Sequence, residues 1–200
     1  MITNFDELIA YTTRLGDTMP ALYHSVVLKR PGCSLQELER IVTSFPNMPE
    51  SYLQVAGDIA LVGIAIGYFQ LAPNSSQGDT LCDKLQDCNR NAGMKGRFQF
   101  DSVYQIGTWD ADPICVAHQA KRYAPGQIVK YNAGNPNQDA VVLAETYEQF
   151  LLLAGNLDMV RDTYADADDP SEGIPEFKTT VENIAPGKDE WMAIADTVLS

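Results

Sequence analysis

The sequence predicts an α+β fold in which a mostly antiparallel sheet is flanked by helices and followed by a helical C-terminal appendage. Helical periodicities dominate both ends of the chain, and short apolar runs separated by turn signals fill its middle. Strand and helix do not alternate regularly. The 200 residues are 45% apolar and 20% charged, a globular composition in a chain long enough to bury its own core.

The first third of the chain is predicted to be mainly helical. Apolar residues fall near one face over residues 4–15, and the capping box Ser34–Glu37 begins a helix that continues to about residue 44. Pro49 suits the first turn of a further helix that runs to about residue 56. Residues 59–71 are predicted to form a buried strand, with a buried helix as the alternative that periodicity leaves open.

The middle of the chain carries the predicted sheet. A helix is expected over residues 78–89 and a glycine-rich turn over 91–96. The extended segments that follow span 98–109, 114–117 and 128–131, and 140–144 is either a strand or the lead-in to the next helix. Because the turns between these segments are short, we expect antiparallel pairing. A helix over residues 145–155 follows, and residues 156–164 are a candidate for a further helix.

The composition changes after residue 155. Residues 156–200 hold 11 acidic and 3 basic residues, whereas residues 1–155 hold 16 and 11. Helical segments are expected on both sides of an acidic loop, and Trp191 lies on an apolar face that would dock on the body. The predicted organisation is an N-terminal helical extension (1–34), an α+β core (35–160) and an acidic helical segment packed on that core (161–200).

The net charge of −13 excludes several classes of partner. Nucleic acids and anionic membrane surfaces attract cationic proteins, so neither is an expected direct partner. The longest apolar run, 59–69, contains two glycines and is too short for a membrane span. The chain opens without a signal-peptide pattern, and its four cysteines form no CxxC pair, so we expect a reduced cytoplasmic protein.

The catalytic and metal-binding patterns that we considered are all incomplete. Cys115 and His118 are an odd number of residues apart, so on a strand they point to opposite faces. Asn135, Asn137 and Asp139 alternate like calcium ligands, but the glycine and the final glutamate of that loop are missing. The sequence therefore predicts no catalytic residue, no metal and no cofactor.

The carboxylates Asp110 and Asp112 lie beside Trp109. Two carboxylates next to an aromatic ring are compatible with glycosidase chemistry. The same spacing before a proline is typical of a turn in which Asp accepts backbone hydrogen bonds. A hydrolase that uses this pair is kept as the third of three functional hypotheses.

The largest anomaly is the run of acidic residues near the start of the last quarter. It is either a solvated charged surface or a docking surface for a basic protein, to which charge complementarity would give speed and selectivity. Tyr104 and Trp109 would then act as aromatic anchors, or they are ordinary core residues. The candidate partner-binding residues are Asp158, Asp162, Asp166, Asp168, Asp169, Glu172, Tyr104, Trp109, Asp110 and Asp112.

Three segments, in order, resemble motifs of the SUKH superfamily, which contains fungal cell-wall-synthesis regulators and bacterial immunity proteins. Met48–Leu53 is similar to its early helix motif. Tyr104–Gly107, followed by Asp112–Ile114, resembles its central strand pair, and Glu145–Leu151 resembles its closing helix. The pair after the early helix is Ala56–Gly57, where the family usually has Asn-Gly.

The resemblance implies an α+β binding module without catalysis, with the family core at residues 35–160. Bacterial members are similar to antidotes that bind a co-encoded toxin, often a nuclease. The leading hypothesis is therefore an immunity protein that neutralises a cognate, basic toxin by direct binding. The alternative is a regulatory scaffold that binds a housekeeping enzyme, as the fungal relatives suggest.

Overall fold

The computed structural model describes residues 1–74, 78–90, 102–135 and 138–200. The predicted turn at 91–96 and the start of the strand predicted at 98–109 lie outside these residues, as does Asn137.

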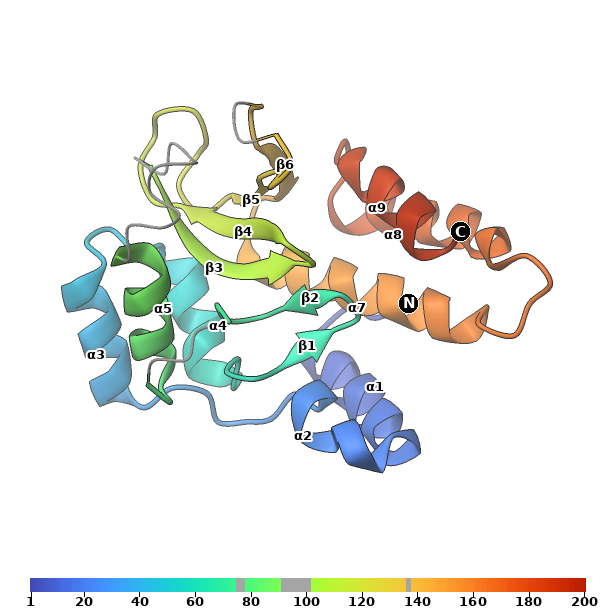
Figure 1. Cartoon of the computed structure of the whole chain (residues 1–200), viewed down its shortest axis with the longest axis horizontal. Coiled ribbons are helices and arrows are strands. Elements are labelled where there is room, and N and C mark those ends of the chain that lie inside the picture. The colour runs from blue at the N-terminus through green and yellow to red at the C-terminus, as the bar shows by residue number, and fades with distance from the viewer. Residues whose placement is uncertain (75–77, 91–101, 136–137) are drawn as a thin grey trace.

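The elements are shown in Figure 1 and are α1 (Phe5–Thr18), η1 (Pro20–Leu22), α2 (Tyr23–Val26), α3 (Leu35–Ser44), α4 (Glu50–Asp58), β1 (Ala65–Ile66), β2 (Phe69–Gln70), α5 (Leu81–Arg90), β3 (Val103–Trp109), β4 (Asp112–Ala117), β5 (Ile128–Lys130), β6 (Val141–Ala144), α7 (Tyr147–Thr163), η2 (Pro170–Gly173), α8 (Ile174–Ile184) and α9 (Glu190–Val198).

The described strands form one open sheet in the order β1-β2-β3-β4-β5-β6, and every neighbouring pair is antiparallel. This confirms the predicted α+β class with a mostly antiparallel sheet and flanking helices. The β3–β4 hairpin pairs Trp109 with Asp112, so β4 begins at Asp112 and includes Pro113. The strand predicted over residues 114–117 therefore begins two residues earlier than expected.

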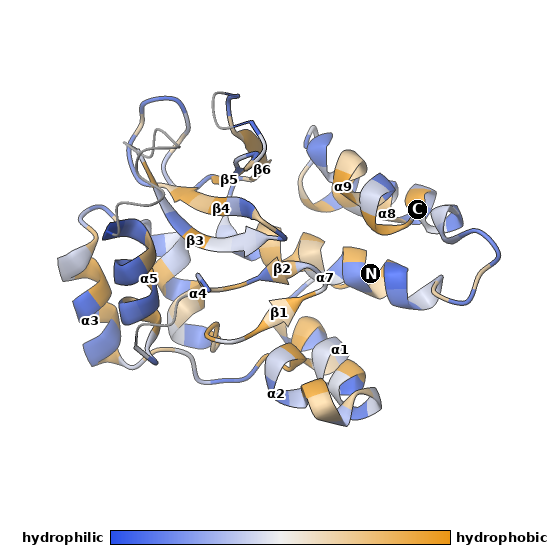
Figure 2. Ribbon diagram, in the orientation of Figure 1, coloured by the Kyte–Doolittle hydropathy of each residue, from blue (hydrophilic) through white to orange (hydrophobic). Residues whose placement is uncertain are grey.

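Helix α7 organises the core. It contacts β1, β6, α1, α4 and α8, and its buried residues surround its whole circumference from Tyr147 to Val160. Figure 2 shows the hydrophobic residues along β1, β4, β6 and α7. Aromatic rings link the sheet, α7 and α9: the Phe69 and Phe150 ring centroids are 5.3 Å apart, and those of Phe150 and Trp191 are 6.0 Å apart.

The helix predicted to end at Gly155 continues to Thr163. Gly155 is buried where α7 crosses α1, and a Cβ at this position would overlap Leu8 Cδ1. The glycine therefore permits a close approach between two helices and does not end one. The boundary predicted between the segments 145–155 and 156–164 was wrong, because a glycine in a helical pattern marks either an end or a packing contact, and local sequence does not distinguish them.

The segment predicted as a buried strand over residues 59–71 is largely buried, but it is not one continuous strand. The segment forms two strands of two residues each, β1 and β2, joined by a turn at Gly67–Tyr68. Gly63 and Gly67 have φ values of 74° and 56°, in the left-handed region that favours glycine. These two residues bend the chain, so the apolar run is a compact hairpin and neither a long strand nor a helix.

Both ends of the chain join one hydrophobic cluster that extends from Ile2 to Leu199. The buried Asn156 side chain accepts from the Ile2 amide at 2.7 Å and donates to the Ile2 carbonyl at 2.8 Å. Trp191 Nε1 donates to the Leu143 carbonyl at 2.8 Å, which fixes α9 to β6. Among the described residues, no helix has the length and apolarity needed to cross a membrane.

Candidate protein-docking surface

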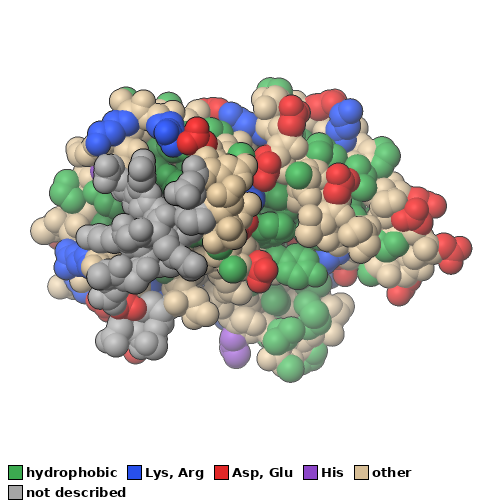
Figure 3. Space-filling view, turned by 45° about the horizontal axis from the view of Figure 1, so that its top comes forward, with side chains coloured by type: hydrophobic (Ala, Val, Ile, Leu, Met, Phe, Trp, Pro, Cys, Tyr) green, Lys and Arg blue, Asp and Glu red, His purple; other side chains and the backbone are tan. Residues whose placement is uncertain are grey.

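Six exposed carboxylates surround the end of α7, η2 and the start of α8. We call this surface the acidic tip; its members are Asp162, Asp166, Asp168, Asp169, Glu172 and Glu176. Residues 162–177 contain no Lys or Arg, and within the described part of the chain none of the six forms an ion pair. Figure 3 shows acidic side chains gathered at the right-hand end of the molecule.

A hydrogen bond at the start of η2 and the close packing of Gly173 hold the acidic tip against α7. The Asp169 carboxylate accepts from the Ser171 amide at 3.0 Å, and hydrogen bonding with Ser171, first from its side chain and then from this amide, lowers the pKa of Asp169. Gly173 is buried against α7, because a Cβ there would lie 2.6 Å from Val160 Cγ1. The charged loop is therefore anchored at η2, and the sequence-predicted residues Asp162, Asp166, Asp168, Asp169 and Glu172 lie together on one exposed end.

Asp158 does not belong to this exposed surface. Its exposed fraction is 3%, its Oδ2 accepts from the Tyr11 hydroxyl at 3.0 Å, and its Oδ1 lies 2.6 Å from Arg161 Nη2. Burial raises the pKa of Asp158, and the Arg161 charge and the Tyr11 hydroxyl oppose that rise. The expectation that Asp158 contacts a partner at the surface is corrected: one turn before Asp162, α7 is still inside the core.

Tyr104 is partly buried and contacts other parts of the chain. Its hydroxyl donates to the Pro46 carbonyl at 2.9 Å, and its ring stacks on His118 with centroids 4.0 Å apart and planes 10° apart. Burial, followed by the nearby Lys121 charge, lowers the pKa of His118. A neutral imidazole is therefore favoured beneath the Tyr104 ring.

Trp109, Asp110 and Asp112 lie at the β3–β4 turn, and Trp109 and Asp112 contact Lys130 of β5. Lys130 Nζ lies 5.1 Å from the Trp109 ring centroid and 3.1 Å from Asp112 Oδ2. The other Asp112 oxygen accepts from the Ala133 amide at 2.7 Å. Both oxygens of Asp112 therefore have structural partners, while Asp110 is exposed in the turn with a φ of 50°.

Lys130 also connects the sheet to α9, because Glu190 Oε1 lies 3.3 Å from its Nζ. Lys188 and Glu145 form a second ion pair at the same junction. In Figure 1 the acidic tip lies at the other end of α7 from β3 and β4. The candidate residues thus do not form one site: five lie on the exposed acidic tip, Trp109 and Asp112 contact Lys130, and Asp158, Tyr104 and Asp110 lie apart from both groups.

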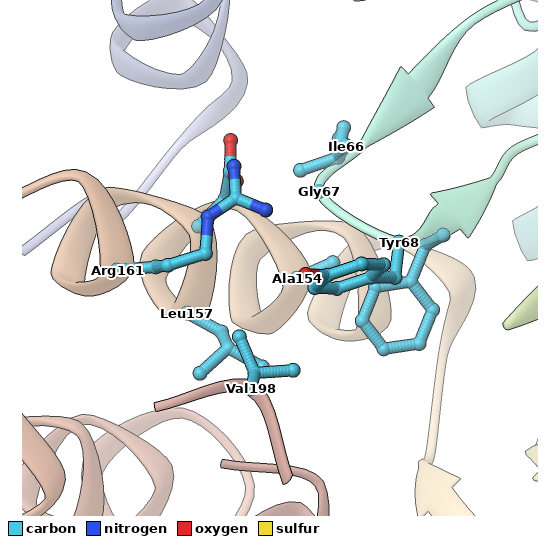
Figure 4. Close-up of a pocket in the computed structure, with 9 residues that line it drawn as sticks. Ile66, Gly67, Tyr68, Ala154, Leu157, Arg161 and Val198 are labelled. Carbon is cyan, nitrogen blue, oxygen red and sulfur yellow. The ribbon is translucent and has the colours of Figure 1, made fainter. Parts of the chain in front are cut away.

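A small pocket beneath the β1–β2 turn was missed by sequence reasoning (Figure 4). Its cavity volume is about 10 Å³, enough for about one water molecule while Arg161 is in place, and it is lined by Ile66, Gly67, Tyr68, Phe69, Ala154, Leu157, Asp158, Arg161 and Val198. Three distant segments meet there, the β-hairpin, α7 and the C-terminal helix. Gly67 supplied a local signal for the turn, but the sequence held no signal that would place Asp158 under it.

Cys33, Cys88 and Cys115 show little of the thiolate character that nucleophiles require. Burial, and then the Glu37 carboxylate, raises the pKa of the Cys33 thiol to about 12, and burial raises that of Cys88 to about 11. Cys115 is fully buried, and its pKa is raised well above its ordinary value. Among the described residues, no group of three or more His, Cys, Asp or Glu side chains is placed to hold a metal ion.

The fold defines the chain as an open, antiparallel α+β protein with an acidic end. Comparison with protein-family models, with curated proteins and with solved structures found no significant match.

Proposed function

We propose that this chain is a non-catalytic, cytoplasmic protein-binding module of the SUKH type that neutralises a basic toxin by direct binding. The observation that carries the proposal is the acidic tip: six exposed carboxylates in a stretch with no basic residue. A nuclease is the toxin class that fits best, because enzymes that bind phosphate backbones present cationic surfaces.

The acidic tip supplies what electrostatic steering requires. Like charges concentrated on one end of a protein raise the encounter rate with a cationic partner, and salt weakens this effect. At physiological ionic strength the field of exposed charges extends only about 8 Å, so clustering is more effective than the same charge spread over the surface. The remaining charge of the chain adds to this preference, since its net value is −13.

The proposal is tested by co-purification from the native host, followed by binding kinetics. A tagged full-length chain is expected to capture one stoichiometric basic protein whose expression alone stops growth. Capture of a housekeeping enzyme complex in its place would favour the scaffold hypothesis and contradict the toxin.

The role of the acidic tip is tested by reversing its charge. The triple variant Asp166→Lys, Asp168→Lys, Glu172→Lys is matched by a control that makes the same charge change at Asp17, Glu39 and Glu148, which are also exposed. The tip variant is expected to slow association by about tenfold or more and to flatten its dependence on salt. Equal association rates for the two triple variants would refute the acidic tip as the docking surface.

A further inference from the structure

The pocket beneath the β1–β2 turn has the chemistry of a slot for a long cationic side chain. Its walls are apolar residues of the hairpin, of α7 and of α9, and its floor is the carboxylate of Asp158, which is buried. The Oδ1 atom of Asp158 receives no well-directed hydrogen bond from the described residues, although Arg161 Nη2 lies 2.6 Å away. A buried carboxylate without a well-directed hydrogen bond on one oxygen would be stabilised by a cation that is better placed than Arg161.

Arg161 shows how such a side chain is held. Its guanidinium lies over the Tyr68 ring, with its central carbon 5.5 Å from the ring centroid, and faces Asp158 at the same time. Figure 4 shows the Arg161 side chain extending from α7 on the side of this helix where the β1–β2 hairpin lies. The Arg161 side chain is 34% exposed, so it has room to move into solvent. Tyr68 is 52% exposed, which leaves its ring available to an incoming group.

We propose that this pocket takes a lysine or arginine side chain of a basic protein partner, which displaces Arg161 from between Tyr68 and Asp158. The inference rests on the proposed function, because it names the anchor that the same partner would insert. The apolar walls would hold the methylene stem, the Tyr68 ring would face the cation, and Asp158 would pair with it.

The position of the slot favours a basic partner over other occupants. Asp162 lies one helical turn after Asp158 in α7 and its charge acts on the Asp158 carboxylate, so the slot opens beside the first residue of the acidic tip. A cationic surface drawn to the tip would therefore bring its side chains to the slot. Gly67 lies close to Asp158, since a Cβ on Gly67 would be 3.1 Å from Asp158 Oδ1. The slot therefore has little room for a group larger than a lysine or arginine side chain.

The slot is tested with small cations and therefore requires no toxin. The full-length protein and its Arg161→Ala variant are titrated with n-butylammonium and n-propylguanidinium chloride, which imitate the two side chains. Binding is followed by the backbone amide NMR signals of Gly67, Tyr68 and Leu157. We expect saturable shifts, with an affinity about fivefold tighter in Arg161→Ala because the competing guanidinium is gone.

Three controls make the result specific. Arg122→Ala removes an arginine whose ion pair with Asp139 is exposed, and it is expected to bind the probes like the parent. 1-Pentanol, which is neutral and similar in length, is expected to cause at most weak shifts. Adding Asp158→Asn to Arg161→Ala is expected to abolish saturation, and Tyr68→Ala gives a second test at an exposed residue if that double variant fails to fold.

The outcomes separate this inference from the proposed function. Equal responses to pentanol and to the cations, or saturation that survives both Asp158→Asn and Tyr68→Ala, would show an apolar cavity and overturn the slot. Absence of saturable binding in Arg161→Ala would overturn it as well. Neither result bears on whether the acidic tip captures a toxin, which the co-purification decides independently.

Discussion

The substitution Gly155→Ala tests how α7 is packed. A Cβ at Gly155 would overlap Leu8 Cδ1 and would lie 3.5 Å from Ile2 Cδ1. Carbon atoms in contact are normally about 3.5–4.0 Å apart, so Leu8 would have to move. Leu8 is fully buried, and the adjacent Asn156 side chain holds Ile2 by two hydrogen bonds. Movement at this crossing would therefore disturb α1.

Two terms of opposite sign set the size of the effect. Replacing glycine by alanine in a helix stabilises by about 1 kcal/mol, and overpacking a core costs about 1–3 kcal/mol. We expect Gly155→Ala to lower the free energy of unfolding by about 1 kcal/mol, measured by urea denaturation. In a Leu8→Val background, which removes the overlapping Cδ1 methyl, the same change should be neutral or stabilising.

Gly57→Ala is the matched control, because Gly57 also lies within a helix but its nearest contact would be Leu38 Cδ1 at 3.2 Å. It should change the free energy of unfolding by less than about 1 kcal/mol. The reasoning would be refuted if Gly155→Ala stabilised the protein in the wild-type background. That result would mean that α1 does not pack against α7 at this glycine.

Two further predictions concern buried polar groups. Trp191→Phe, which removes the donor to the Leu143 carbonyl and part of a buried ring, should lower the free energy of unfolding by about 1–3 kcal/mol in urea denaturation. The folded-state pKa of Asp158 is raised, so its contribution to stability is fully present below the unfolded-state pKa of about 3.9 and is lost as pH rises through the raised value. Asp158→Asn should therefore remove a fall in stability with rising pH above about 4, and an identical pH profile for parent and variant would contradict the burial of this carboxylate.

Sequence reasoning succeeded where a few neighbouring residues decide the structure. Ser34 was expected to cap a helix, and its hydroxyl accepts from the Glu37 amide at 3.2 Å. The reciprocal half of that capping box was not found, because Glu37 Oε1 accepts from the Cys82 amide in place of the Ser34 amide. The local cap is thus encoded within one turn, while the partner of Glu37 comes from a helix distant in the sequence.

The candidate site likewise has features that follow from neighbouring residues and features that depend on residues distant in the sequence. Exposure of the acidic tip follows from its composition, since a stretch with six carboxylates and no cation has no internal means of burial. The burial of Asp158 was not predictable in this way. Its hydrogen-bond partner Tyr11 is 147 residues away, and the pocket beside it needs the β1–β2 turn, which periodicity had assigned to a longer strand.

The continuation of α7 beyond Gly155 connects the core to the acidic tip. Asp158 and Asp162 are one helical turn apart, yet the first is buried under the β-hairpin and the second is exposed. The helix therefore leaves the core between these two residues, and Arg161 lies at that boundary, pairing inward with Asp158. A helix that ended at Gly155 would provide neither the buried carboxylate nor the exposed end, so the continuation of α7 past Gly155 is a condition for both proposed elements of recognition.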